Sequence, residues 1–299
     1  MRLKRREFLI LTGLVSGLGL VGLERWLTTH QISDVAIPFP ASRATTKPLL
    51  RFVAIADTGT GGSAQYAVAA AMTRFHQQHP FPMVVLAGDN IYTNGEIEKI
   101  KAVFEQPYQA LLQQQVKFHA CLGNHDIRTK NGEAQLQYPD FNMRGRYYTF
   151  RQGPVQFFAL DTNSNASWQA QLTWLEQELR QTKAPWKVVF GHHPLYSSGR
   201  YGSNSALINT LTPLFKQHQV QLYINGHEHD YERTQAIDGT TYLIVGNAGA
   251  SLRSVGRSDW TKYAASRHGF TVVEVYPDFM EITAVDPDNQ PFDRGIVSL

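Results

Sequence analysis

Carboxylates, amides, imidazoles and one phenol gather in five short clusters of this 299-residue chain. The clusters are ADTG (56–59), GDNIY (88–92), GNHD (123–126), GHHP (191–194) and GHEH (226–229). Each has an ordinary explanation when taken alone, because Gly, Asn and Asp form turns and a single His is more often a core or surface residue. Five such clusters in one chain argue against coincidence. Their donors suit hard to borderline metals such as Fe, Mn or Zn, and they lack the thiolates of a structural zinc site.

Apolar segments with strand or helix spacing lie between these clusters and would position them. Helical spacing is expected at 64–78, 97–113, 168–180 and 206–217. Strands are expected at 50–56, 83–87, 116–122, 147–150, 155–160, 187–190, 221–224, 241–245, 270–276, 280–285 and 295–297. Each cluster ends or follows a strand, and ligands of α/β proteins gather outside the carboxyl ends of strands. The pattern predicts two β-sheets packed together in one domain, with helices outside.

Charge and composition exclude some classes of protein. Hydrophobic and charged fractions of 42% and 18% are typical of a globular chain. Residues 1–44 hold six Lys or Arg and three Asp or Glu, so that 22 of each remain from the totals of 28 and 25. No basic stripe is left to neutralise phosphates, which argues against nucleic-acid binding. Cys121 is the only cysteine, which excludes an intramolecular disulfide, and its apolar neighbours predict that it is buried.

The ordered clusters resemble the motifs of the calcineurin-like metallophosphoesterases, and within them those of the purple acid phosphatases. The resemblance extends from Asp57 to His229. Many relatives have a metal-binding His at the third position of the first motif, where this chain has Gly59. Tyr92 stands where protein phosphatases of the superfamily have an aspartate that supports a catalytic histidine. Losing the histidine and gaining a phenol together is typical of the purple branch.

This resemblance implies an α/β fold that is a four-layer α/β/β/α sandwich, with two mixed β-sheets packed face to face and helices outside. It also implies a site for two metal ions. The implied ligands are Asp57, Tyr92 and His229 for the first ion, Asn124, His192 and His227 for the second, and Asp89 as the bridge between them. Anionic oxygens favour Fe(III) at the first position, whereas an amide and two imidazoles favour Fe(II), Zn(II) or Mn(II) at the second.

Two further histidines are candidates for catalysis. His125 resembles the family's histidine that contacts the phosphate and helps the leaving group to depart. His193 occupies a variable position, and it either helps to hold the substrate or has no direct role. Asp126 either orients His125 or closes a turn, and we interpret it as a turn residue. The segment 195–203 is expected to border the site.

The implied reaction is hydrolysis of small phosphate monoesters by direct attack of a metal-bound hydroxide, as in an acid phosphatase. No G-x-S-x-G or P-loop pattern supplies another nucleophile or phosphate cradle. One alternative is a phosphodiesterase of the same fold, since the metal core barely discriminates ester classes. The other is a non-catalytic di-metal redox or binding protein, against which His125 argues, because metal storage needs no acid for a leaving group. The sequence indicates no oligomeric state.

The N-terminus has the character of an export signal. Lys4, Arg5 and Arg6 precede an apolar stretch at 8–23, and paired arginines followed by Phe-Leu resemble a twin-arginine signal. The alternative is a permanent membrane anchor, for which the stretch is slightly short. We expect residues 1–44 to form the signal and a linker, and 45–299 to form the catalytic domain. The protein is then exported, with membrane contact only through the N-terminal segment if this is not cleaved.

Overall fold

The computed structural model describes residues 41–299, so that the predicted export segment lies outside the described range. Its α-helices are α2 (Ser63–Gln78), α3 (Gln106–Gln113), α4 (Glu133–Leu136), α5 (Trp168–Gln181) and α6 (Ser205–Gln217). Its strands are β1 (Leu50–Ile55), β2 (Met83–Leu86), β3 (Lys117–Ala120), β4 (Tyr148–Gln152), β5 (Val155–Ala159), β6 (Trp186–Phe190), β7 (Leu222–Asn225), β8 (Tyr231–Thr234), β9 (Thr241–Val245), β10 (Thr261–Ala265), β11 (Phe270–Val275), β12 (Phe279–Val285) and β13 (Pro291–Ser298).

The strands form two mixed sheets. One has the order β13-β12-β11-β1-β2-β3, in which β1, β2 and β3 are parallel and the C-terminal strands add antiparallel pairs. The other has the order β10-β8-β9-β7-β6-β5-β4, in which β5, β6, β7 and β9 are parallel. Each parallel run therefore presents several carboxyl ends at one sheet edge.

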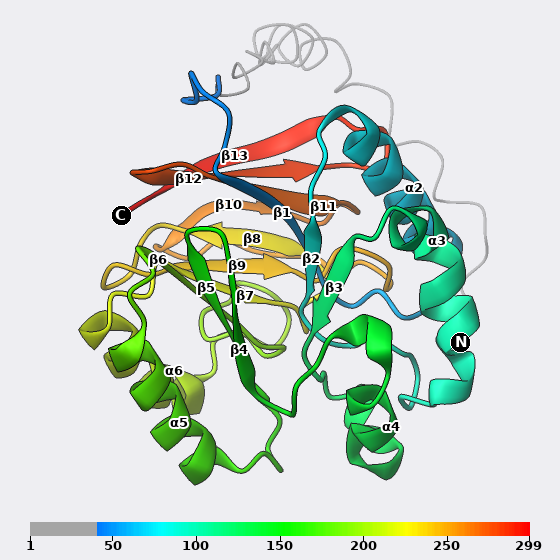
Figure 1. Cartoon of the computed structure of the whole chain (residues 1–299), viewed down its shortest axis with the longest axis horizontal. Coiled ribbons are helices and arrows are strands. Elements are labelled where there is room, and N and C mark those ends of the chain that lie inside the picture. The colour runs from blue at the N-terminus through cyan, green and yellow to red at the C-terminus, as the bar shows by residue number, and fades with distance from the viewer. Residues whose placement is uncertain (1–40) are drawn as a thin grey trace, which may run out of the picture. The chain divides into compact units, whose positions relative to one another are not determined.

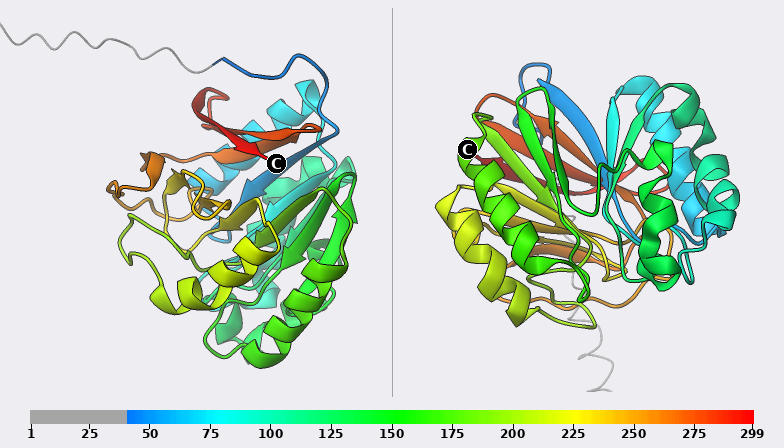
Figure 2. Two further views of the ribbon diagram at one scale, coloured as in Figure 1. Left: turned by 90° about the vertical axis from the view of Figure 1, so that its left-hand side faces the viewer. Right: turned by 60° about the horizontal axis from the view of Figure 1, so that its bottom comes forward.

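The two sheets pack face to face, and helices cover their outer faces (Figures 1 and 2). In β1, Phe52 points into the inner core between the sheets and its ring lies 5.2 Å from that of Phe157. The next residue, Val53, belongs instead to the outer core beneath α2 and α3. Leu175 and Leu211 place α5 and α6 on the outer face of the other sheet. Three separate cores thus confirm the predicted α/β/β/α sandwich.

These cores explain why the strands are continuous apolar runs in the sequence. Val84 and Leu86 of β2 face the helices, whereas Met83 and Val85 face the inner core, so both faces are buried. Alternation of polar and apolar residues is not expected in such strands. Cys121 is also buried, as its apolar neighbours indicated.

Some elements differ from the prediction. The helix expected at 97–113 is a 3₁₀ turn (Ile97–Lys99), a π-helical stretch (Lys101–Glu105) and α3, with Pro107 in the first turn of α3. The strands β8 and β10 were not predicted, because charged residues make them look like loops. Arg233 of β8 pairs with Asp293 of β13 at 2.7 Å, a contact between the two sheets that sequence spacing does not reveal.

The start of the described chain contacts the folded domain. Ser42 Oγ and the backbone N–H of Arg43 both donate hydrogen bonds to Glu281 of β12, at 3.0 and 2.9 Å. The predicted domain boundary at residue 45 stays a prediction. Within residues 41–299, no helix is both long enough and apolar enough to cross a bilayer.

Candidate metal centre

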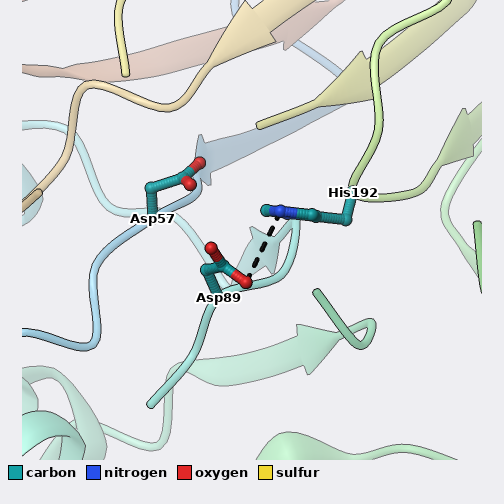
Figure 3. A group of neighbouring side chains, drawn as sticks. All are labelled: Asp57, Asp89 and His192. Carbon is teal, nitrogen blue, oxygen red and sulfur yellow. Dashed lines mark ion pairs between the residues drawn. The ribbon is translucent and has the colours of Figure 1, made fainter. Parts of the chain in front are cut away.

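The candidate site residues follow five strands that end at the same place. Asp57 follows β1, Asp89 and Tyr92 follow β2, and Asn124 follows β3. From the other sheet, the pair at 192–193 follows β6 and the motif 226–229 follows β7. Figure 3 shows Asp57, Asp89 and His192 directed toward one another from their separate strands. One donor atom of each of these three buried residues lies within 4.8 Å of the others.

Asp57, Tyr92 and His229 form the first group of donors. The Tyr92 hydroxyl lies 3.0 Å from Asp57 Oδ1 and 3.2 Å from His229 Nε2. His229 Nε2 also lies 3.4 Å from Asp57 Oδ1. The other ring nitrogen, Nδ1, lies 2.9 Å from the carbonyl oxygen of Ser251, which only accepts, so Nδ1 carries the proton. Nε2 is therefore the nitrogen that faces the site.

Asn124, His192 and His227 form the second group. Asn124 Oδ1 lies 3.1 Å from His192 Nε2 and 2.9 Å from His227 Nδ1. His192 Nδ1 lies 3.0 Å from the carbonyl oxygen of Ala87 and donates a hydrogen bond to it. Nε2 is therefore the ring nitrogen that is free to bind a metal ion. The two rings meet at 79°, with centroids 5.2 Å apart. His192 uses Nε2 toward the site, whereas His227 uses Nδ1.

Asp89 lies between the two groups. Its Oδ1 is 3.5 Å from His192 Nε2 in the second group. A donor atom of Asp89 also lies within 4.8 Å of one of Asp57 in the first group, and the charge of Asp89 helps to raise the pKa of Tyr92. The backbone N–H of His125 donates to Oδ1 at 2.9 Å and fixes the carboxylate. Asp89 therefore lies where it can bridge the two groups.

The donor spacing fits metal ions. Bonds of about 2.0–2.2 Å from an ion to N or O ligands place neighbouring ligand atoms roughly 3–3.5 Å apart. The separations within the two groups run from 2.9 to 3.4 Å. Carboxylate, phenol, amide and imidazole donors without thiolates suit Fe, Zn or Mn. The residues present thus fit a dinuclear site.

Burial and crowding of acids shift the titration of the site. Burial raises the pKa of Asp57 to about 6, and the charge of Asp89 adds to the effect of burial while His229 opposes it. Burial also raises the pKa of Tyr92, together with the charges of Asp57 and Asp89. Burial lowers the pKa of His227 to about 2 and that of His192 well below its usual range. The acids thus need positive charge nearby, while both imidazoles of the second group are neutral and keep their lone pairs.

Local backbone conformation is unusual at the candidate ligands. Asp57, Asp89 and His227 have φ angles of 56°, 52° and 71°, in the left-handed region that most side chains avoid. Such strain persists where the surrounding structure holds it, and it is concentrated at functional sites. Gly59 is required for a different reason, because a Cβ there would overlap the carbonyl oxygen of Asn90. The segment carrying Tyr92 therefore occupies the space that a histidine at position 59 would need.

His125 lies beside both groups with one nitrogen already engaged. Its Nδ1 is 2.6 Å from the carbonyl oxygen of Thr93 and must donate to it. Its Nε2 is 3.9 Å from Asp89 Oδ2 and 3.3 Å from an Nη2 of Arg128. Arg128 also donates to Thr93 at 3.2 Å. Sequence reasoning missed Arg128, although a cation three residues after a candidate phosphate-binding histidine was a signal.

His193 lies next to the second group and is held by Thr162. The Thr162 hydroxyl accepts the N–H groups of His192 and His193 at 3.1 and 2.9 Å, so its own proton goes to His193 Nδ1 at 2.9 Å. Nε2 of His193 is therefore the protonated nitrogen. Burial lowers the pKa of this ring, which keeps it neutral. The motif at 191–194 did not reveal the part played by Thr162.

Asp126 does more than close a turn. Its buried carboxylate accepts the backbone N–H groups of Asn90, Ile91 and Gly123 at 2.8–3.1 Å. It also accepts the Gln135 amide at 3.1 Å. Asp126 thus ties the segment bearing Asp89 to the segment bearing Asn124, and does not orient the ring of His125.

The segment 195–203 borders the site as expected. The Tyr201 ring stacks on His227, with centroids 4.8 Å apart and planes at 26°. The guanidinium of Arg253 lies over the Tyr201 ring, 5.0 Å from its centroid, and donates to the carbonyl oxygen of His227 at 2.8 Å. Its Nη2 is 3.2 Å from His229 Nε2. Arg253 belongs to no motif, so only the fold places it here.

Comparison with known proteins agrees with this geometry. The family model described as calcineurin-like phosphoesterase matches residues 50–231. The chain belongs to this family. The phosphoesterase is 30% identical to purple acid phosphatase 17 of Arabidopsis thaliana over 230 residues, covering 67% of this chain and 68% of that protein. It is 26% identical to tartrate-resistant acid phosphatase type 5 of Mus musculus over 311 residues, covering 88% and 95%.

Solved structures share the fold. Purple acid phosphatase PPD1 from yellow lupin seeds superposes with a TM-score of 0.73 at 18% identity, covering 83% of this chain and 53% of that one. GAP50, the anchor in the inner membrane complex of Plasmodium, superposes with a TM-score of 0.74 at 23% identity, covering 84% and 89%. At such identities the likeness shows the fold alone.

These comparisons confirm the predicted family and its purple acid phosphatase-like branch. The phosphoesterase is a metal-dependent hydrolase of phosphoric esters, and its family implies a dinuclear metal site. The buried group of Asp57, Asp89 and His192 agrees with such a site. The assignment of individual ligands and of the catalytic roles of His125 and His193 stays a prediction.

Proposed function

We propose that this phosphoesterase hydrolyses small phosphate monoesters by direct attack of water at phosphorus, as an acid phosphatase does. The observation that carries the proposal is the position of Asp89 between two donor groups, with one oxygen 3.5 Å from His192 of the second group and a donor atom within 4.8 Å of Asp57 of the first. Two ions held so close together would share one phosphate group. The acid phosphatases among the relatives support the ester class.

Within this proposal each donor has one task. Asp57, Tyr92 and His229 would hold one ion, Asn124, His192 and His227 would hold the other, and Asp89 would be a ligand of both. When bound, the ions supply Lewis acidity to the phosphoryl oxygens and lower the pKa of a water. Burial lowers the pKa of His227 to about 2 and also lowers the pKa of His192. Both rings therefore stay unprotonated and able to bind metal in acidic solution.

The chain's own hydrogen-bond donors complete the site. His125 keeps its Nδ1 proton on Thr93, so to act as the acid the ring must carry a second proton on Nε2, and this imidazolium proton goes to the departing alkoxide oxygen. Arg128, at 3.3 Å from that nitrogen, is a cation beside the same position. His193 presents a protonated Nε2, because Thr162 occupies Nδ1. We assign His193 to hydrogen bonding of a substrate oxygen.

The identity of the metals is a further part of the proposal. Asp57, Asp89 and a Tyr92 phenolate would place three anionic oxygens around the first ion, which favours Fe(III). The amide and two neutral imidazoles of the second group favour a divalent ion, Fe(II), Zn(II) or Mn(II). Metal analysis of untagged protein checks the stoichiometry, for which two ions per chain are expected.

A comparison of ester classes tests the reaction. Metal-loaded protein is given phenyl phosphate and diphenyl phosphate, with an Asp89→Asn variant as the control that should lose both metal and turnover. We expect faster hydrolysis of the monoester, and net inversion at phosphorus with a chiral monoester, since water attacks directly. Preference for the diester would favour a phosphodiesterase, and net retention would indicate a covalent phosphoenzyme. Tight metal binding without turnover of either ester would favour the redox or binding alternative.

Export by the twin-arginine route is also proposed, on the residues at 4–23 alone. Arg5→Lys together with Arg6→Lys should retain the precursor in the cytoplasm, because the paired arginines are the recognised signal. Cell fractionation measures this, with Arg2→Lys as the control. Unchanged export in cells lacking the twin-arginine translocase would refute the proposal.

A further inference from the structure

A cavity of about 450 Å³ opens directly beside the second donor group. Asn124 and His193 are among its lining residues, most of which carry polar but uncharged side chains. Ile127 and Trp168, both half-buried, line it, as does Ala206 at the exposed start of α6. Its volume lies within the range of about 300–1,000 Å³ that is typical of small-molecule sites. The cavity is thus continuous with the place where the phosphate is expected.

The walls of this cavity are built to stay in place. The indole N–H of Trp168 donates to the carbonyl oxygen of Asn163 at 3.1 Å, which fixes the ring and uses its polar atom. Asn204 caps α6 by accepting the N–H of Leu207 at 3.1 Å, so the first turn of the helix is held at the rim. A second cavity of about 280 Å³ shares His193 and Asn204 with the first.

Both cavities are lined by uncharged side chains, among them the neutral imidazoles of His193 and His227. No Asp, Glu, Lys or Arg among residues 41–299 lines either one. An ester whose alcohol carries a carboxylate, an ammonium group or a further phosphate would lose hydration there without gaining an ionic partner in the cavity walls, because Arg128 lies beside His125 and lines neither cavity. A hydrocarbon ring would instead cover Ile127, Trp168 and Leu207, and each square ångström so covered favours binding.

We propose that this cavity binds the alcohol part of the substrate, and that the enzyme selects monoesters of uncharged, largely apolar alcohols such as aryl phosphates. The inference rests on the proposed function, since it assumes that a phosphate group occupies the metal centre. It adds the substrate class and assigns Ile127, Trp168 and Ala206 to leaving-group selection. Esters of charged alcohols, such as phosphoamino acids, are disfavoured, and so are nucleoside polyphosphates, whose leaving group is a charged phosphate.

Binding of stable phosphonates tests the cavity without requiring turnover. Isothermal titration calorimetry of the metal-loaded protein compares methylphosphonate, phenylphosphonate and 4-carboxyphenylphosphonate. Phenylphosphonate should bind roughly tenfold more tightly than methylphosphonate, because its ring covers apolar surface. The carboxylate should remove about tenfold of that affinity, because it is desolvated without a partner.

Two variants locate the effect. Ala206→Lys places a cation at the exposed rim and should recover roughly threefold of the affinity for the carboxylated ligand. The matched control Ala206→Gln has similar bulk and no charge, and should leave the ratio between the two aryl ligands unchanged. Ile127→Asn should bring the affinities for phenyl- and methylphosphonate to within about threefold of each other.

Equal binding of phenyl- and 4-carboxyphenylphosphonate would overturn the inference. So would ratios that neither Ala206→Lys nor Ile127→Asn changes. Failure of the proposed function is a separate result, namely that no monoester is hydrolysed by the loaded enzyme. In that case the phosphonate affinities still support or overturn the cavity's preference.

Discussion

Tyr92→Phe removes the phenol that we propose as a metal ligand, and the structure sets the size of the effect. In the metal-free protein, burial and the charges of Asp57 and Asp89 raise the pKa of Tyr92 above its ordinary value of 10.0. Ionising the phenol at pH 7 therefore costs at least about 4 kcal/mol, three units at 1.36 kcal/mol each. A trivalent ion must offset this cost. Binding of Fe(III) as a phenolate complex then releases one proton that the Phe variant does not have.

This proton makes the advantage of the wild type depend on pH. Between pH 7 and 8.5 the ratio of Fe(III) affinities, wild type over Tyr92→Phe, should rise about tenfold per pH unit. Asp57, whose pKa is about 6, is mostly ionised in this range and contributes little to the slope. Competition against one Fe(III) chelator measures both proteins, so that the titration of the chelator cancels in the ratio.

Colour gives a second readout of the same ligand. A phenolate bound to Fe(III) has a visible charge-transfer band, so the iron-loaded wild type should be violet to pink and the Phe variant colourless. Tyr201→Phe is the matched control, because its ring stacks on His227 without belonging to either donor group. A ratio that does not change with pH, or a band that persists in Tyr92→Phe, would refute ligation by Tyr92.

Three other substitutions have defined outcomes. His125→Ala should keep both metals and slow esters with poor leaving groups most, since those need the proton; equal slowing across a series of substituted phenyl phosphates would contradict its role as the acid. Asp126→Ala leaves four hydrogen-bond donors without their carboxylate, and should lower the free energy of unfolding by about 3 kcal/mol or more in urea titrations. The exposed Asp140→Ala is its control, and similar losses in both would refute the role of Asp126. Burial and the charges of Glu228 and Glu232 raise the pKa of Asp230 to about 8, so the folded state keeps a proton that the unfolded chain loses near pH 3.8, and stability falls as the pH rises between these values. The free energy of unfolding of metal-free Asp230→Asn, taken relative to that of the wild type, should therefore rise by about 1–3 kcal/mol from pH 5 to pH 7.5. The same difference between the two proteins at both pH values would exclude the raised pKa.

Much of the fold could be predicted because the parallel strands are buried on both faces. Segments such as 83–87 are uninterrupted apolar runs for that reason. β8 escaped prediction because its buried Glu232 is stabilised by partners far along the chain, Ser198 and Thr261, at 2.7 and 2.6 Å. Local sequence cannot reveal partners that only folding brings near, so a polar strand looks like a loop.

The candidate site, like the fold, could be predicted from the sequence only in part. The motifs contain all the residues proposed as ligands. They also show that Gly59 replaces the histidine found in many relatives and that Tyr92 adds a phenol. Arg128, Thr162 and Arg253 were not predicted, since they act through contacts with His125, His193 and His227 rather than through a motif of their own. The larger role of Asp126 was missed because its partners at 90 and 91 follow a different strand.

The sequence by itself determined which kinds of donor follow which strands, because a glycine-marked strand end is a local property of the chain. Only the tertiary structure decided which atom of each donor faces the centre. His229 presents Nε2 because Ser251 engages its Nδ1, whereas His227 presents Nδ1 to Asn124. The uncharged cavity between Ile127 and Ala206 is likewise a product of the fold, since its walls come from segments of the two sheets that meet only when the sandwich closes.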